Sequence, residues 1–90
     1  MYGKSYEDLF NKGIMALKQN APEKALEYFE KANIFVFDDP ELYNSMASAH
    51  IQLGEYNKAA FVLSKSLIFD QYNPVTLSNF AILNTMTQLK

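Results

Sequence analysis

The amino-acid sequence predicts an all-α protein of roughly five helices, arranged as antiparallel pairs that stack into an α-α solenoid. Three observations predict this fold. The chain resembles itself when it is shifted by 34 residues, apolar residues recur at intervals of three and four, and an Asn or Asp followed by Pro stands at corresponding points. Repeats of this length are typical of helix–turn–helix units that are too small to bury their own apolar faces alone.

The self-similarity is informative because of where the matches fall. Eight identical pairs align among the 56 positions compared. They are Glu7/Glu41, Lys24/Lys58, Ala25/Ala59, Lys31/Lys65, Ile34/Ile68, Phe35/Phe69, Pro40/Pro74 and Ala47/Ala81. Helix-starting prolines, small residues and large apolar residues thus recur in step. We expect one domain over residues 1–90, made of repeats at 6–39 and 40–73 and a terminal helix or half repeat at 74–90.

The first unit reads as two helices joined by a short turn. The first helix is predicted to begin at a capping box formed by Ser5 and Asp8 and to end at Asn20, which suits the left-handed position after a helix. Pro22 suits the first turn of the second helix. That helix has an amphipathic stripe spaced by three and four residues. The stripe consists of Ala25, Leu26, Phe29, Ala32 and Phe35.

The second unit repeats this plan. Asp39 and Pro40 supply an N-cap and a proline at the first helical position, and Gly54 ends the third helix. Its apolar stripe consists of Tyr43, Met46, Ala47, His50 and Ile51. The fourth helix is predicted to run from about Tyr56 to Phe69, with Ala59, Ala60, Leu63 and Leu67 turned inward. Asn73 and Pro74 then begin a fifth helix with the same cap-plus-proline device.

One stretch, "NIFVFDDPELY" at residues 33–43, has the local propensity of a strand, because β-branched and aromatic residues follow one another. A strand there could pair only with its repeat copy, and an isolated pair of strands is marginal in water. The helical period therefore predicts the end of one helix, a turn and the start of the next. Phe35 and Phe69 are expected to be buried between units, so that Phe35→Ala costs about 3–5 kcal/mol. Val36 and Phe37 have no explanation in the pattern.

The spacing of small and large residues resembles the tetratricopeptide repeat, a helix–turn–helix unit of 34 residues. The match is clearest in "LYNSMASAHIQLGEYNKAAFVLSKS", through Tyr43, Met46, Ala47, Gly54, Tyr56, Ala59, Leu63 and Ser66. In the first unit Leu9, Gly13, Ala16, Asn20, Ala25, Phe29 and Ala32 occupy the same slots. Lys12 departs from the family pattern, which has a core Leu there. The resemblance covers residues 6–90 and implies a right-handed superhelical stack.

In that family the first helices of successive units line a concave groove that binds a peptide or a partner helix, as in adaptor and scaffold proteins. Carried over by position, the candidate groove residues are Phe10, Asn11, Ile14, Asn44, Ser45, Ser48, Asn79 and Ile82, together with Glu7, Leu17, Glu41, Gln52, Val75, Ser78 and Met86. We expect a neutral lining whose asparagine amides hydrogen-bond an extended peptide. Two alternatives remain open: the asparagines form a solvated helix face, and the large apolar residues belong to the core.

One subtype of the family does not fit. Arrays that clamp a terminal carboxylate use lysine, arginine and asparagine at fixed groove positions. The slots that should be cationic hold Phe10, Val75 and Asn79 here.

The fifth helix is more apolar than one side of a terminal helix should be. Its apolar residues are Val75, Leu77, Phe80, Ile82, Leu83, Met86 and Leu89. Terminal units of a solenoid normally have a polar outer face. The alternative function is therefore a structural or assembly module that docks or self-associates, as a homo-oligomer, through Phe80, Leu83 and Met86.

Composition excludes several classes of protein. A net charge of −2 and the absence of arginine argue against a nucleic-acid partner. No cysteine is present, so disulfides and thiolate metal sites are excluded. The sequence has neither the apolar run of a membrane span nor the pattern of a signal peptide. We therefore expect a cytoplasmic protein without membrane insertion.

No residue pattern indicates catalysis. His50 is the only histidine, and Ser48, two residues away, belongs to another face of the helix. The carboxylates of Asp38, Asp39 and Glu41 stand at a helix start, where capping and the helix dipole explain them. There is no phosphate-binding loop and no metal-ligand spacing. We expect no enzyme activity, no cofactor and no metal, and a packed or half-exposed His50 in place of a tyrosine.

Overall fold

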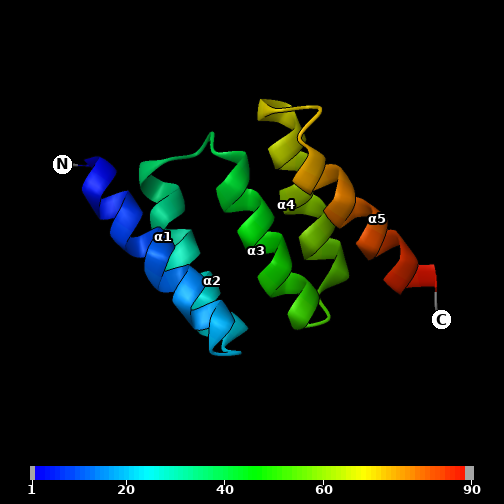
Figure 1. The fold of residues 1–90 in the computed structure, drawn as a ribbon, viewed down its shortest axis with the longest axis horizontal. Coiled ribbons are helices and arrows are strands. Elements are labelled where there is room, and N and C mark those ends of the chain that lie inside the picture. Colours follow the sequence, from blue (N-terminus) through cyan, green and yellow to red (C-terminus); the bar gives the residue numbers. More distant parts are fainter. Residues whose placement is uncertain (1, 89–90) are drawn as a thin grey trace.

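The computed structural model describes residues 2–88, and the part of the chain it describes contains five α-helices and no strand. They are α1 (Tyr2–Lys18), α2 (Pro22–Phe35), α3 (Pro40–Gln52), α4 (Tyr56–Phe69) and α5 (Pro74–Gln88). Figure 1 shows each helix running antiparallel to the one before it. The all-α prediction is confirmed, and "NIFVFDDPELY" is a helix end, a turn and a helix start rather than a strand.

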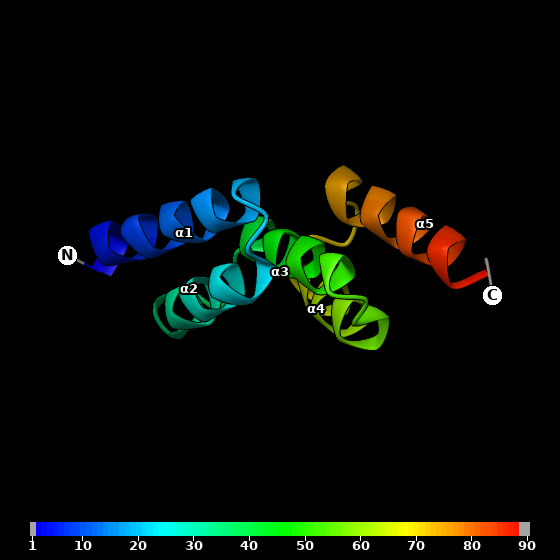
Figure 2. The ribbon, with the colours of Figure 1, turned by 90° about the horizontal axis from the view of Figure 1, so that it is seen from below.

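The helices stack in pairs. α1 packs mainly on α2, α3 mainly on α4, and α5 packs on both α3 and α4. In the turned view of Figure 2, α1, α3 and α5 lie on one face of the stack, and α2 and α4 lie on the other. Because α1 and α5 rise on either side of α3, the face that these three helices share curves inward.

The predicted helix caps and helix ends are confirmed at four places. The Asp39 side chain accepts a hydrogen bond from the Glu41 backbone N–H at 3.0 Å, with Pro40 in the first turn of α3. The Asn73 side chain accepts from the Thr76 backbone N–H at 3.0 Å at the start of α5. After α1 and α3, Asn20 and Gly54 adopt positive φ values of 61° and 75°, the left-handed conformation that ends a helix.

The predicted start of α1 is wrong. The helix begins at Tyr2, so Ser5 and Asp8 lie inside it and are exposed instead of forming a capping box at its end. No proline stands in the first turns to stop the helix, and it therefore continues past the box toward the N-terminus.

The core depends on small residues where helices cross. Gly13 is buried, and a Cβ atom added there would lie 2.3 Å from Cε1 of the fully buried Phe29 ring. Ala25, Ala47 and Ala59 are likewise fully buried. Small residues at these positions let the helix axes approach closely, while large side chains fill the space beside them.

The predicted burial of Phe35 and Phe69 is wrong. Their exposed fractions are 39% and 43%, because both stand in the last turn of their helices, at the edge of the packed region. Phe69 stacks on Tyr43 with ring centroids 6.2 Å apart, and its ring also meets the edge of Phe37. The Tyr43 hydroxyl donates a hydrogen bond to the Phe37 carbonyl. The Phe37 side chain, which the repeat pattern left unexplained, is mostly exposed and has an aromatic contact with Phe69.

Candidate functional site

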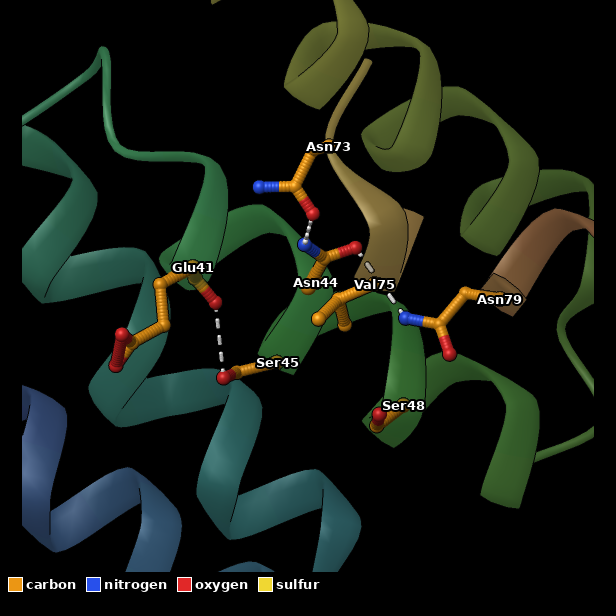
Figure 3. A pocket seen from close by; sticks show the side chains of 7 residues that line it. All are labelled: Glu41, Asn44, Ser45, Ser48, Asn73, Val75 and Asn79. Atoms are coloured by element: carbon orange, nitrogen blue, oxygen red, sulfur yellow. Dashed lines mark hydrogen bonds between the residues drawn. The ribbon is translucent and has the colours of Figure 1, made fainter. Parts of the chain in front are cut away.

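The inward-curving face has a first hollow, between α3 and α5, of about 300 Å³. Figure 3 shows the residues that line it: Glu41, Asn44, Ser45, Ser48, Asn73, Val75 and Asn79. Most of these side chains are polar, and Val75 provides an apolar spot at the start of α5.

Three asparagines cross this hollow as a hydrogen-bonded chain. The Asn79 amide donates to the Asn44 oxygen at 3.2 Å, and the Asn44 amide donates to the Asn73 oxygen at 3.5 Å. Asn44 is only 6% exposed. In Figure 3 the Asn79 oxygen points away from Asn44.

A pair of buried hydroxyl groups is hydrogen-bonded to this asparagine network. Ser66 of α4 and Thr76 of α5 are both fully buried, and their oxygens lie 2.7 Å apart. The Thr76 hydroxyl also donates to the Asn73 oxygen at 3.2 Å. Because each hydroxyl is satisfied inside the protein, this pair fixes α5 on α4 and holds Asn73 in position.

A second hollow of about 320 Å³ lies between α1 and the start of α3. It is lined by Tyr6, Glu7, Phe10, Asn11, Asp39 and Glu41. The Tyr6 hydroxyl donates to the Asp39 carboxylate at 2.6 Å and so bridges α1 and α3. Partial burial, together with this hydrogen bond and the nearby negative charges, raises the pKa of Tyr6 well above its ordinary value.

Glu41 lines both hollows, so they form one continuous surface across α1, α3 and α5, which we call the groove. Of the predicted groove residues, Asn44, Ser45, Ser48 and Asn79 meet at the first hollow. The second hollow brings together Phe10 and Asn11. Ile14 and Ile82 line neither of them.

Phe10 is a core residue more than a groove residue. Its exposed fraction is 9%, and its ring packs edge-on against Phe29 and Tyr6 at centroid distances of 5.8 and 5.9 Å. Ile14 is also partly buried against the core. Helix α1 is therefore oriented so that these two apolar residues face inward, as in the alternative in which they belong to the core.

Three groove residues were not predicted: Tyr6, Asp39 and Asn73. The sequence predicted the last two only as helix caps. The 34-residue register pairs Asp39 with Asn73, and each lines one of the two hollows. A signal for both was thus present, since side chains at equivalent helix starts must lie along the same edge of a stacked array.

The predicted docking residues of α5 are less exposed than expected. Leu83 is 6% exposed, and with Phe80 it lines a hollow of about 210 Å³ between α4 and α5. Met86 is half-buried, and Leu89 lies outside the described residues. The exposed large apolar residues of α5 are Val75, Leu77 and Ile82.

His50 is packed, as predicted. It is 8% exposed, and its Nδ1 lies 2.8 Å from Oε1 of Glu55. This hydrogen bond, with a smaller contribution from Lys58, holds the pKa of the Glu55 carboxyl below its ordinary value. The pair links the end of α3 to the turn before α4, which explains His50 without catalysis.

Within residues 2–88, no group of His, Asp and Glu side chains is arranged to hold a metal ion. Across the same residues, none of the helices combines the length and the apolar character needed to cross a membrane.

Comparison with known proteins agrees with the paired-helix architecture. The family model of the tetratricopeptide repeat matches residues 40–70, the segment that contains α3 and α4. No curated protein matches the chain. Repeats of this family generally mediate protein–protein interaction and are not themselves enzymes. The second helix pair is thus similar to a tetratricopeptide repeat, and the stack of helix pairs as a whole is consistent with the fold of such repeats.

Proposed function

We propose that this chain is an adaptor or scaffold module that holds an extended segment of a partner protein in the groove. The observation that carries the proposal is the continuity of the two hollows across α1, α3 and α5, through the shared Glu41. As part of this proposal, the chain is divided into two repeats, at residues 6–39 and 40–73, and a half repeat at 74–90.

The groove offers the groups that an extended backbone needs. A peptide presents alternating N–H donors and carbonyl acceptors, and side-chain amides and hydroxyls can pair with both. The Asn79 oxygen is available as an acceptor, and Ser48 contributes a hydroxyl beside it. Asn44 has a different role, because it is buried and both ends of its amide are engaged within the chain. Asn44 therefore positions Asn79 rather than binding the peptide itself.

A bulky side chain at the floor of the groove tests the proposal. Ser48 is partly exposed in the first hollow, whereas Ser64 is exposed on α4, on the opposite side of the stack. We expect Ser48→Trp to weaken capture of peptides from a random-peptide display library about tenfold or more. Ser64→Trp, the matched control, should leave capture unchanged. Equal capture by the two variants would refute groove binding.

A second candidate function is docking through α5, and the repeat register favours it. The face of α3 that packs on α4 includes Tyr43, Ala47 and His50, all of them buried. The equivalent positions on α5, 34 residues later, are Leu77, Ala81 and Asn84, and all three are exposed. α5 thus presents the face on which a helix partner packs in the preceding unit.

The oligomeric state of the protein in solution tests whether α5 mediates self-association. If α5 drives self-association, sedimentation velocity at high micromolar concentration should show an oligomer that Leu77→Lys dissociates. Phe61→Lys, at an exposed apolar position of α4, is the control and should leave the oligomer intact. A monomer for the unmodified protein would exclude self-association.

A further inference from the structure

The groove is acidic, although the sequence predicted a neutral lining. Its charged side chains are Glu7, Asp39 and Glu41, and no lysine lines either hollow. Glu7 and Glu41 are exposed, and Asp39 is half-buried. Within residues 5–88 the ion pairs are those of Glu55 with His50 and Lys58, so neither glutamate of the groove has a cationic partner there.

The Asp39 carboxylate is held by two donors. One oxygen accepts from the Tyr6 hydroxyl at 2.6 Å and the other from the Glu41 backbone N–H at 3.0 Å. Both oxygens of this side chain are thus engaged at the N-terminus of α3. Tyr6 and the helix start therefore hold the Asp39 carboxylate in position in the second hollow, which Glu7 and Glu41 also line.

The two glutamates of this hollow, Glu7 and Glu41, are both exposed to solvent. Figure 3 shows the Glu41 carboxylate directed away from Asn44 and Asn79. The first hollow is uncharged except for Glu41 at its edge and has Val75 as its apolar contact. The groove thus changes along its length from acidic between α1 and α3 to amide-lined between α3 and α5.

We propose that the segment held in the groove is basic, with a lysine or arginine side chain between Glu7, Asp39 and Glu41 and with uncharged residues over Val75 and Asn79. This inference depends on the proposed groove function and names the chemistry of its partner. A metal ion is not the occupant that the carboxylates favour, because no group of acidic side chains in the described residues converges to hold one. An ammonium or guanidinium group needs no such convergence, since each of its several N–H donors can reach a different carboxylate.

Charge complementarity at exposed groups has a predictable size. Each exposed ion pair contributes modestly, so removal of one groove carboxylate should weaken a basic peptide about two- to fivefold. The effect should shrink as salt screens the charges. Asp39 is unsuitable for this test, because its replacement also removes the cap of α3.

The test uses the full chain and a random-peptide display library. The described residues extend 44 Å along their longest axis, a span that about 12 extended residues cover. The best peptide is titrated against three proteins: the unmodified chain, Glu7→Gln with Glu41→Gln, and Glu23→Gln with Glu27→Gln. The last pair is exposed on α2 and removes the same charge outside the groove.

We expect the selected peptides to be rich in Lys or Arg. The groove double variant should weaken binding about fourfold to twenty-fivefold, and the α2 control should bind as the unmodified chain does. If the selected peptides were neutral or acidic and Ser48→Trp weakened their binding, the basic-partner inference would be overturned, but groove binding would still hold. Equal loss in the two charge variants would also overturn it, because the effect would then come from net charge. If Ser48→Trp binds the selected peptides as tightly as the unmodified chain does, the proposed groove function is refuted, and this inference is refuted with it.

Discussion

The two joints between helix pairs, at residues 36–40 and 70–74, share the same arrangement of a capping side chain followed by a proline. They differ in the chemical group of the capping side chain. At each joint a side chain caps the next helix: Asp39 binds a backbone N–H of α3, and Asn73 binds one of α5. The Asp39 carboxylate also bridges to Tyr6 on α1. The Asn73 amide instead joins the polar network of α3 and α5.

This difference shows how equivalent positions of a repeated fold can carry different chemistry. The cap positions are equivalent, so the helices start alike, but the cap at each joint contributes a different chemical group to the hollow beside it. The first joint leaves a carboxylate and the second leaves an uncharged amide. A substitution that exchanges these caps should therefore change the groove's chemistry more than its fold.

The largest effect is expected from the aromatic residues at the ends of α2 and α4. Phe69→Ala should lower the free energy of unfolding by about 2–3 kcal/mol, because it removes a half-exposed ring that stacks on Tyr43. Phe35→Ala should cost about 2 kcal/mol, below the range for a fully buried phenylalanine. Urea unfolding of both variants measures this. A loss of about 4 kcal/mol or more for Phe35→Ala would show that its ring is buried after all.

At the second joint, Thr76→Val should destabilise the protein by about 1–3 kcal/mol, because the buried Ser66 hydroxyl loses its close partner and Asn73 loses a donor. The side chain keeps its shape, so packing is a smaller part of the effect. Thermal and urea unfolding provide the measurement. Thr85→Val, at an exposed position on the same helix, is the control, and an equal change in both variants would contradict a special role for the buried pair.

At the first joint, Asp39→Ala should cost about 1–2 kcal/mol through the lost cap and the lost bridge to α1. Tyr6→Phe removes the bridge alone and should cost about 0.5–1.5 kcal/mol. Asp39→Asn keeps a capping oxygen and should fall between the unmodified protein and Asp39→Ala. If Asp39→Asn were as unstable as Asp39→Ala, the carboxylate charge, and not the cap, would dominate this joint.

The smallest effect is expected at the turn within the second helix pair, which lies outside both joints. The lowered pKa of Glu55 means that its pairing with His50 stabilises the fold at pH values above the ordinary value of 4.5 and that this contribution is lost as the pH falls through the lower folded pKa. Glu55→Gln should therefore be less stable than the unmodified protein near neutral pH, and the difference should disappear in acid. Unfolding at a series of pH values checks this; a difference that grows on acidification would contradict it.

Helix order and helix ends were largely predictable because they depend on local signals. The cap-plus-proline pairs, Asn20 and Gly54 each act within a few residues of themselves, and the stripes spaced by three and four residues fixed which segments are helical. Strand propensity at residues 34–37 was overridden because no partner strand existed. The one boundary that failed, at Ser5, lies where no proline limits the helix.

The side-chain arrangement of the groove was predictable only in part. A shift of one residue rotates a helix face by about 100°, so spacing alone could not decide whether Phe10 lines the groove or the core. The asparagine chain joins Asn44 to residues 29 and 35 positions away, and such pairings depend on how the helices pack. Asp39 and Asn73 were recognised as caps, but their position beside the hollows became evident only from the stacked helices.

The most direct test of the account follows the side-chain amide signals of asparagines by NMR while the best display-selected peptide is added. Asn11 and Asn79 line the groove, whereas Asn57 and Asn84 line the hollow between α4 and α5. Groove binding predicts that the signals of Asn11 and Asn79 shift, while those of Asn57 and Asn84 stay in place. Shifts confined to Asn57 and Asn84 would contradict groove binding and would locate the partner on α5 instead.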